Sequence, residues 1–101
     1  MQRPPKLTAA EVKRKLLVIL EEGSVIYSWH CHEESMVARN VSAQDVEDLL
    51  ENGHPSEDAE WSEKDGNWKY RIEGIDVEGD KLSAIVVIFD SILTVRVITV
   101  F

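Results

Sequence analysis

Apolar residues recur at helical spacing near the start of the chain. In the segment LTAAEVKRKLLVILEEG, residues 7–23, the apolar stripe consists of Val12, Leu16, Ile19 and Leu20. Thr8 precedes Glu11 by three residues, which is the spacing of a capping box, where each side chain satisfies a free backbone amide of the first turn. Gly23 follows the last apolar position and favours termination there. The pattern predicts a helix between Thr8 and Gly23 with one buried face.

A second helix is indicated after a short strand. The segment SVIYS, residues 24–28, combines β-branched and aromatic residues between turn formers and predicts the strand. In the segment 41–53, Ser42 is a good N-cap, Asp45 stands at the third helical position near the positive end of the helix dipole, and Gly53 ends the pattern. The positions expected to face the core are Val46, Leu49 and Leu50.

The hydrophobic period changes to two in the last third of the chain. Trp68, Tyr70 and Ile72 alternate with Lys69, Arg71 and Glu73. This alternation predicts a half-buried strand with Tyr70 facing the core. A turn around residues 78–80 and a tight turn at Asp90 and Ser91 then bound two apolar strands. The acidic segment 54–67 is expected to be a loop with a short strand near residues 59–62.

These elements predict an α+β fold, an antiparallel β-meander packed by the N-terminal helices on one face. The length of 101 residues fits one domain, residues 1–101. Two prolines and basic residues without an apolar run predict a flexible tail over residues 1–7.

Charge and cysteine content narrow the function classes. The net charge is −8, and residues 33–65 carry eleven acidic against two basic residues. That balance argues against a protein that coats nucleic acid, and no direct DNA partner is expected. No apolar run is long enough for a membrane span, so no membrane partner is expected. A single cysteine, Cys31, cannot form an internal disulfide and favours a cytoplasmic location.

One segment concentrates residues that carry chemistry. SWHCHEESMVARNVS, residues 28–42, contains Ser28, His30, Met36, Arg39, Val41 and Ser42. This run, followed by DVEDLLENG, resembles a small bacterial family catalogued as domain of unknown function 4258, over about residues 24–101. The resemblance implies a relative of the RelE, MqsR and BrnT toxins: a small cytoplasmic α+β ribonuclease or an inactive cousin, paired with an antitoxin.

The family pattern implied by this resemblance has a His at the strand-to-helix junction, then Arg-Met and a second Arg. Here Glu34 or Ser35 stands where the first Arg is expected, and the spacing from His30 to Arg39 is one residue longer. His32 is an alternative anchor, because on an α-helix it shares one face with Met36 and Arg39.

Metal-independent RNA cleavage requires a proton acceptor, a cation that stabilises the phosphorane and an acid for the leaving oxygen. We predict His30 and His32 as base or acid, Arg39 and Arg71 as phosphate clamps, and Lys69 as a secondary cation. RNA and a cognate antitoxin are the predicted partners. No cofactor and no metal are expected, since consecutive residues cannot all converge on one tetrahedral ion.

The sequence leaves other interpretations open. A histidine could simply cap or pack at the helix start while Arg39 pairs with an acid such as Glu47. Cys31 could be a nucleophile or a small buried thiol. The three tryptophans could stack on bases or pack in the core. The acidic segment 33–65 could dock a basic protein, which would make the chain a non-catalytic interaction or immunity module.

Overall fold

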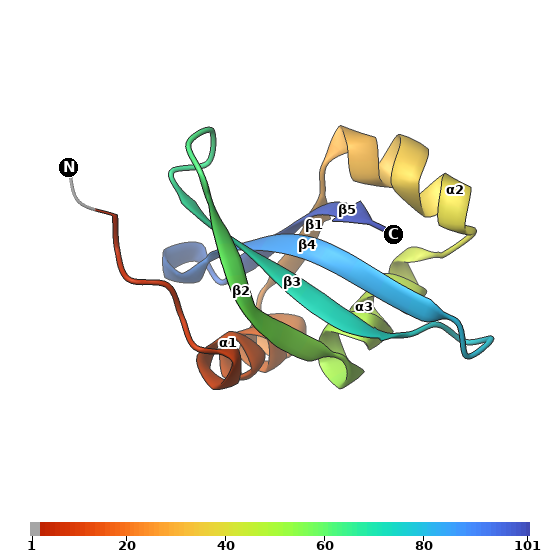
Figure 1. Ribbon diagram of the computed structural model, residues 1–101, viewed down its shortest axis with the longest axis horizontal. Coiled ribbons are helices and arrows are strands. Elements are labelled where there is room, and N and C mark those ends of the chain that lie inside the picture. The colour runs from red at the N-terminus through yellow and green to blue at the C-terminus, as the bar shows by residue number, and fades with distance from the viewer. Residues whose placement is uncertain (1–2) are drawn as a thin grey trace.

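Five strands form one sheet in the order β1-β5-β4-β3-β2 (Figure 1). The strands are β1 (Ser24–Tyr27), β2 (His54–Ser62), β3 (Asn67–Ile75), β4 (Lys81–Phe89) and β5 (Thr94–Val100). The computed structural model describes residues 3–101. Strands β3 to β5 form the predicted antiparallel meander, which β2 extends by a fourth strand, whereas β1 pairs in parallel with β5. The α+β fold class is therefore confirmed, with a parallel edge that the sequence did not indicate.

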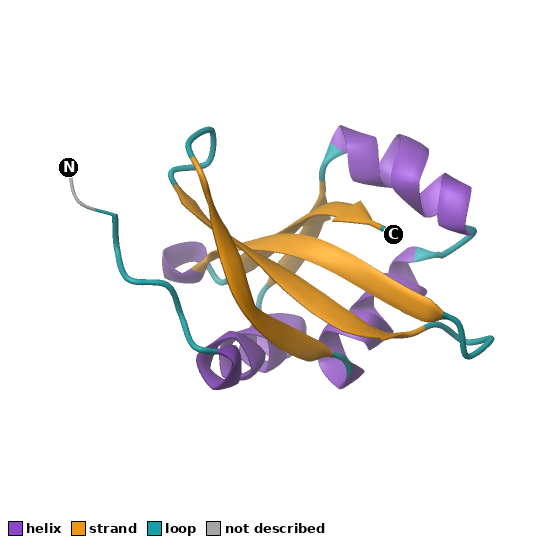
Figure 2. Cartoon of the chain, viewed as in Figure 1, coloured by secondary structure: helices purple, strands orange, loops and turns teal. Residues whose placement is uncertain are grey.

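The helices are α1 (Ala9–Glu22), α2 (Met36–Arg39) and α3 (Ala43–Asn52), and a π-helical turn (Cys31–Ser35) leads directly into α2. Figure 2 shows α1 and α3 against the sheet, while the π-helical turn and α2 follow the end of β1 and lie beside the C-terminal part of β5. Within residues 3–101, no helix has the length and apolarity needed to cross a bilayer.

Both predicted capping boxes are present. Thr8 Oγ1 accepts a hydrogen bond from Glu11 N at 3.2 Å, and Glu11 Oε1 accepts one from Thr8 N at 3.0 Å. Ser42 and Asp45 make the same reciprocal pair at the start of α3. Because these bonds satisfy amides that have no partner inside the helix, the helix starts follow from local sequence.

The core lies between the sheet and the two longer helices. The apolar stripes of α1 and α3 contribute Val12, Leu16, Ile19, Val46, Leu49 and Leu50. The facing side of the sheet contributes Tyr70, Ile72, Leu82, Ala84, Val86, Ile88, Val95 and Val97. Tyr70 faces this core, as the alternation predicted. The opposite face of the sheet carries the polar members of the alternating strands, together with the fully buried Val87.

The segment after α3 differs from its prediction as a loop. It forms the nine-residue strand β2, which begins at His54 immediately after the helix. β2 is an edge strand and pairs only with β3, so Pro55, which lacks an N–H group, is tolerated there. The register shifts between Pro55 and Ala59, and an irregular acidic edge discourages pairing with other chains. Pairing with β3 thus overrides the weak strand propensity of this segment.

The predicted flexible tail is in contact with the sheet along part of its length. Residues 1 and 2 lie outside the described residues. Trp68 Nε1 donates to the carbonyl oxygen of Pro4 at 2.7 Å, and Leu7 N donates to Tyr70 Oη at 2.9 Å. The guanidinium carbon of Arg3 lies 5.1 Å from the centre of the Trp61 ring. The segment from Arg3 to Leu7 therefore lies against β2 and β3.

We expect both tyrosines to ionise at higher pH than free tyrosine. Burial, reinforced by the nearby Glu47 carboxylate, raises the pKa of Tyr27 to about 12, and burial also raises the pKa of Tyr70. The folded state holds these protons more tightly than the unfolded chain, whose tyrosines ionise near pH 10. This contribution to stability is therefore complete below about pH 10 and is lost as the pH rises towards the folded-state values.

Tyrosinate absorbance should detect this shift, and urea unfolding at several alkaline pH values should show stability falling in the same window. Tyr27→Phe should remove part of the pH dependence. Two tyrosines that titrate together at the ordinary value in the folded protein would contradict the prediction.

Candidate functional site

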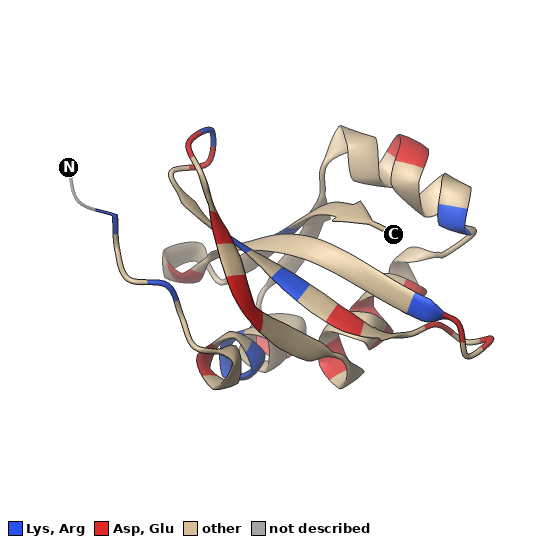
Figure 3. Ribbon diagram, viewed as in Figure 1, with Lys and Arg blue, Asp and Glu red and all other residues tan. Residues whose placement is uncertain are grey.

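The face of the sheet opposite α1 and α3 is here called the open face. Its residues include Lys69, Arg71 and Glu73 from β3, Ile85 and Val87 from β4, and Arg96 and Thr99 from β5. Figure 3 shows basic and acidic segments side by side on β2 and β3. The open face therefore brings together charged side chains that are far apart in the sequence.

A cross-strand row on the open face joins two of the predicted site residues. Arg71 lies opposite Ile85, and Ile85 lies opposite Thr99. Residues directly opposite each other in a sheet project from the same face. His30 Nε2 lies 3.3 Å from Thr99 Oγ1. Arg71 and Thr99 are two interstrand spacings apart, or roughly 10 Å between their backbones. His30 lies next to Thr99, at the end of the row away from Arg71.

Arg71 is held over an aromatic ring. Its guanidinium carbon lies 4.9 Å from the centre of the Phe101 ring, and its Nε lies 3.6 Å from Glu73 Oε2, which is too long for a hydrogen bond. Nε is buried and has no hydrogen-bond partner among the described residues. A planar guanidinium stacked on a ring is oriented for an anion that approaches along its edge.

A hollow of about 280 Å³ adjoins Arg71. It is lined by Asp58, Ala59, Glu60, Lys69, Arg71 and Ile85. Lys69 Nζ lies 3.7 Å from Glu60 Oε2, and the Glu60 side chain is 84% exposed. Such an exposed pair contributes little stability, so a phosphate can compete for Lys69. The hollow is therefore lined by two cations, Lys69 and Arg71, and each lies close to a carboxylate.

The other two predicted site residues lie elsewhere. Arg39 Nη2 donates to the carbonyl oxygen of Lys81 at 2.8 Å and lies 3.6 Å from Asp76 Oδ2. It lines a separate hollow, which neither His30 nor His32 lines. His32 is exposed, and its Nδ1 lies 3.1 Å from Glu33 Oε1. Arg39 pairs with an acid, as one interpretation expected, but that acid is Asp76 and not Glu47.

Most of the chain matches one protein-family model. Residues 27–101 match the family model described as Domain of unknown function (DUF4258). The chain belongs to this family. No curated protein and no solved structure matches the chain. The open-face residues and His30 all fall inside the DUF4258 match, whereas α1 lies outside it.

A π-helical turn in the DUF4258 region separates residues that were predicted to share a face. Met36 N donates to the carbonyl oxygen of Cys31, five residues back, so the turn contains one more residue than an α-helical turn. Met36 is consequently buried while His32 is exposed. Single-turn π-helices of this kind frequently occur at functional sites.

Sequence reasoning missed the residues that position His30. Ser28 Oγ donates to the carbonyl oxygen of Ile98 at 2.7 Å and accepts from Cys31 N at 3.0 Å, which ties the start of the helical segment to β5. His30 Nδ1 lies 3.7 Å from Glu34 Oε1. Strict alternation in β5 would have placed Thr99 on the core face with Val95 and Val97. The register shift between Ile85 and Val86 of β4 places it opposite Ile85 instead, and no local pattern indicates this shift or the contact of Thr99 with His30.

Cys31 is expected to react slowly with thiol reagents in the folded protein. Its side chain is fully buried, and burial raises the pKa of the thiol, although a hydrogen bond involving Ser35 partly opposes this effect. Because the thiolate is the reactive species, both effects of burial suppress nucleophilic attack. Disulfide exchange with a chromogenic reagent should be slow in buffer and fast in denaturant. Equal rates in both conditions would restore Cys31 as a candidate nucleophile.

Proposed function

We propose that this DUF4258 protein is a toxin-type, metal-independent ribonuclease whose RNA site is the open face. The observation that supports the proposal is the row from His30 through Thr99 and Ile85 to Arg71. In this row an exposed imidazole lies at the edge of the open face that carries the Arg71 guanidinium. The resemblance to RelE, MqsR and BrnT toxins supports the same reaction class.

In the proposed reaction, His30 accepts the proton of an RNA 2′-hydroxyl, and the freed oxygen attacks the adjacent phosphorus. The bond from phosphorus to the 5′ oxygen then breaks, and Lys69 or the protonated His30 donates a proton to that leaving oxygen. Arg71 stabilises the negative charge that develops on the phosphorane. Tyr70 takes no part, because it is buried and its hydroxyl accepts a hydrogen bond from Leu7 N.

The acids of the open face set the expected strength of RNA binding. Asp58 and Glu60 line the hollow beside Lys69, and Glu73 lies beside Arg71. Each carboxylate opposes the approach of a phosphate. The proposed site therefore binds RNA weakly and in a salt-dependent manner. Its selectivity among RNA sequences comes from the positions of the few cations that contact the RNA.

The direct experiment is to incubate the purified protein with single-stranded RNA in the presence of a chelator. We expect cleavage products that carry 2′,3′-cyclic phosphate ends. Arg71→Ala should abolish cleavage, whereas Arg39→Ala, a matched variant outside the open face, should retain it if its melting temperature is preserved. Absence of cleavage by the wild-type protein would refute the ribonuclease, and a reversed result for the two arginines would refute the open-face site.

A ribonuclease of this type must be restrained in the cell, so we also propose a cytoplasmic location and a cognate antitoxin. Overexpression of the chain alone should arrest bacterial growth, and coexpression of the antitoxin should relieve the arrest. Growth arrest that persists after loss of the open-face cations would show that the toxicity has another cause.

The second candidate function is a non-catalytic interaction or immunity module for a basic protein. The pairing of cations with acids favours it: Lys69 with Glu60, Arg71 with Glu73, Arg96 with Asp65 and Arg39 with Asp76. A chain whose cations are neutralised locally presents a predominantly acidic surface. Harmless overexpression together with salt-sensitive capture of a basic nuclease would favour this function over the ribonuclease.

A further inference from the structure

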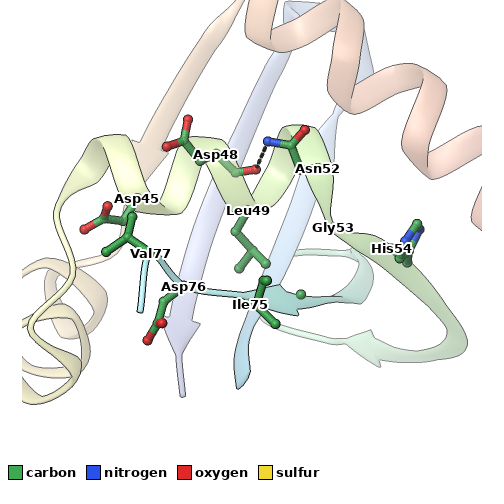
Figure 4. Close-up of a pocket in the computed structure, with 10 residues that line it drawn as sticks. Asp45, Asp48, Leu49, Asn52, Gly53, His54, Ile75, Asp76 and Val77 are labelled. Atoms are coloured by element: carbon green, nitrogen blue, oxygen red, sulfur yellow. Dashed lines mark hydrogen bonds between the residues drawn. The ribbon is translucent and has the colours of Figure 1, made fainter. Parts of the chain in front are cut away.

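A groove of about 580 Å³ lies between α3 and the end of β3, away from the open-face hollow (Figure 4). Its lining includes the apolar residues Leu49, Ile75 and Val77 and the acidic residues Asp45, Asp48 and Asp76. Figure 4 shows Leu49 pointing from α3 towards Ile75. The groove thus combines an apolar floor with an acidic rim.

The apolar part of the groove is unusually open to solvent. Ile75 is 69% exposed and Val77 is 80% exposed. Leu49, by contrast, is buried between α3 and the sheet. Adjacent exposed apolar residues rimmed by charge are characteristic of surfaces that a partner covers.

The backbone of β3 is also available at this point. β2 begins at His54, opposite Glu73, so no strand lies beside Ile75 on that side. On the other side Ile75 pairs with Lys81 of β4. Asp76 N donates to the carbonyl oxygen of Asp80, so Asp76 directs its backbone groups across the β3–β4 hairpin. The backbone N–H and C=O groups of neighbouring residues in a strand point to opposite sides. Those of Asp76 point towards β4, so those of Ile75 point into the groove.

Two of the three carboxylates on the rim of the groove have structural roles. Asp45 caps α3 through Ser42, and Asp76 accepts hydrogen bonds from Glu78 N and Asp80 N. Asp48 accepts only from the Gln44 side chain through its carboxylate. Asp48 is therefore the rim carboxylate that other side chains engage least, whereas Asp76 also lies 3.6 Å from Arg39 Nη2.

We propose that this groove binds an extended segment of a partner protein in which lysine or arginine alternates with apolar residues. The segment adds a short strand to β3 at Ile75. Its alternate side chains project from opposite faces of the sheet, so its apolar side chains lie beside Ile75 on the side of Arg71 and Glu73, and its cations lie on the α3 side near Asp48. A helical segment fits less well, because a helix satisfies its own backbone groups and would leave those of Ile75 unpaired. This binding site is independent of the proposed ribonuclease activity.

The test uses the full chain labelled with ¹⁵N and a short capped peptide of alternating lysine and valine. We expect amide shifts to concentrate at Leu49, Ile75 and Val77 and to spare Lys69 and Arg71. A peptide with glutamate in place of lysine should not bind. Shifts that map to the open face, or binding of both peptides alike, would overturn the proposal.

Backbone methylation of the peptide tests strand addition. In an extended peptide, the N–H groups of alternate residues point to opposite sides, so only one alternate set can pair with Ile75. Methylating that set should abolish binding, and methylating the other set should preserve it. If both methylated peptides bind like the parent, the peptide does not add a strand to β3.

Charge reversal tests the rim. Asp48→Lys should weaken binding of the lysine-valine peptide by about fivefold or more. Glu22→Lys is the matched control, because it makes the same charge change at an exposed position of α1 outside the groove. Equal weakening by both variants would mean that net charge, and not the groove, determines binding.

Discussion

His30→Ala is expected to lower the rate of RNA cleavage by at least about 100-fold, the usual contribution of a positioned general base or acid. His32→Ala is expected to change it by less than about twofold. His30 reaches the open face through Thr99, whereas the polar contact of the His32 ring is with its neighbour Glu33. The two histidines therefore differ in position relative to Arg71 although they lie two residues apart.

These variants form a closely matched pair. Their side chains are 56% and 66% exposed, and both lie in the same helical segment, so both substitutions should leave the fold intact. Single-turnover cleavage of a labelled RNA, with circular dichroism as a folding control, measures the difference. An active His30→Ala together with an inactive His32→Ala would assign the base to the other histidine and remove the open-face row from the mechanism.

Local sequence was sufficient to predict the helices of this protein. Thr8 with Glu11, and Ser42 with Asp45, determine where α1 and α3 begin, and the apolar spacing determines which sides are buried. These signals act over one or two turns, so they can be read without knowledge of the fold.

The strands were predictable where residues were β-branched or apolar, as in β1, β4 and β5, or where side chains alternated, as in β3. β3 alternates strictly, and Tyr70 accordingly faces the core while Lys69 and Arg71 lie on the open face. β2 has no comparable apolar alternation, and its extended conformation depends on hydrogen bonds to β3. Likewise, the parallel pairing of β1 with β5 joins residues about seventy positions apart, which no local pattern records.

The candidate site was predictable in its residue types but not in its grouping. Lys69 and Arg71 were predicted to lie on a polar strand face, and that prediction is confirmed. The contact of His30 with Thr99 depends on how the helical segment after β1 docks on β5. The π-helical turn then changes the helical phase between His32 and Arg39, so reasoning from α-helical spacing grouped these residues wrongly.

Leu16→Ala is expected to lower the free energy of unfolding by about 3 kcal/mol, because it removes a fully buried side chain and leaves a cavity. For a domain of this size, that corresponds to a fall in melting temperature of roughly 15 °C. Leu17→Ala is the matched control, since Leu17 is the next residue of α1 and is 42% exposed. Leu17→Ala should lower the free energy of unfolding by less than about 1 kcal/mol.

This pair of variants also tests the prediction of a single domain. α1 lies outside the residues that match the DUF4258 family, yet Val12, Leu16 and Ile19 belong to the same buried cluster as Ile72 and Val86. If α1 and the sheet unfold together, Leu16→Ala shifts one transition whether it is followed by far-ultraviolet dichroism or by tryptophan fluorescence. A fluorescence transition of the sheet that is unchanged by Leu16→Ala would mean that α1 is a separable addition to the family fold.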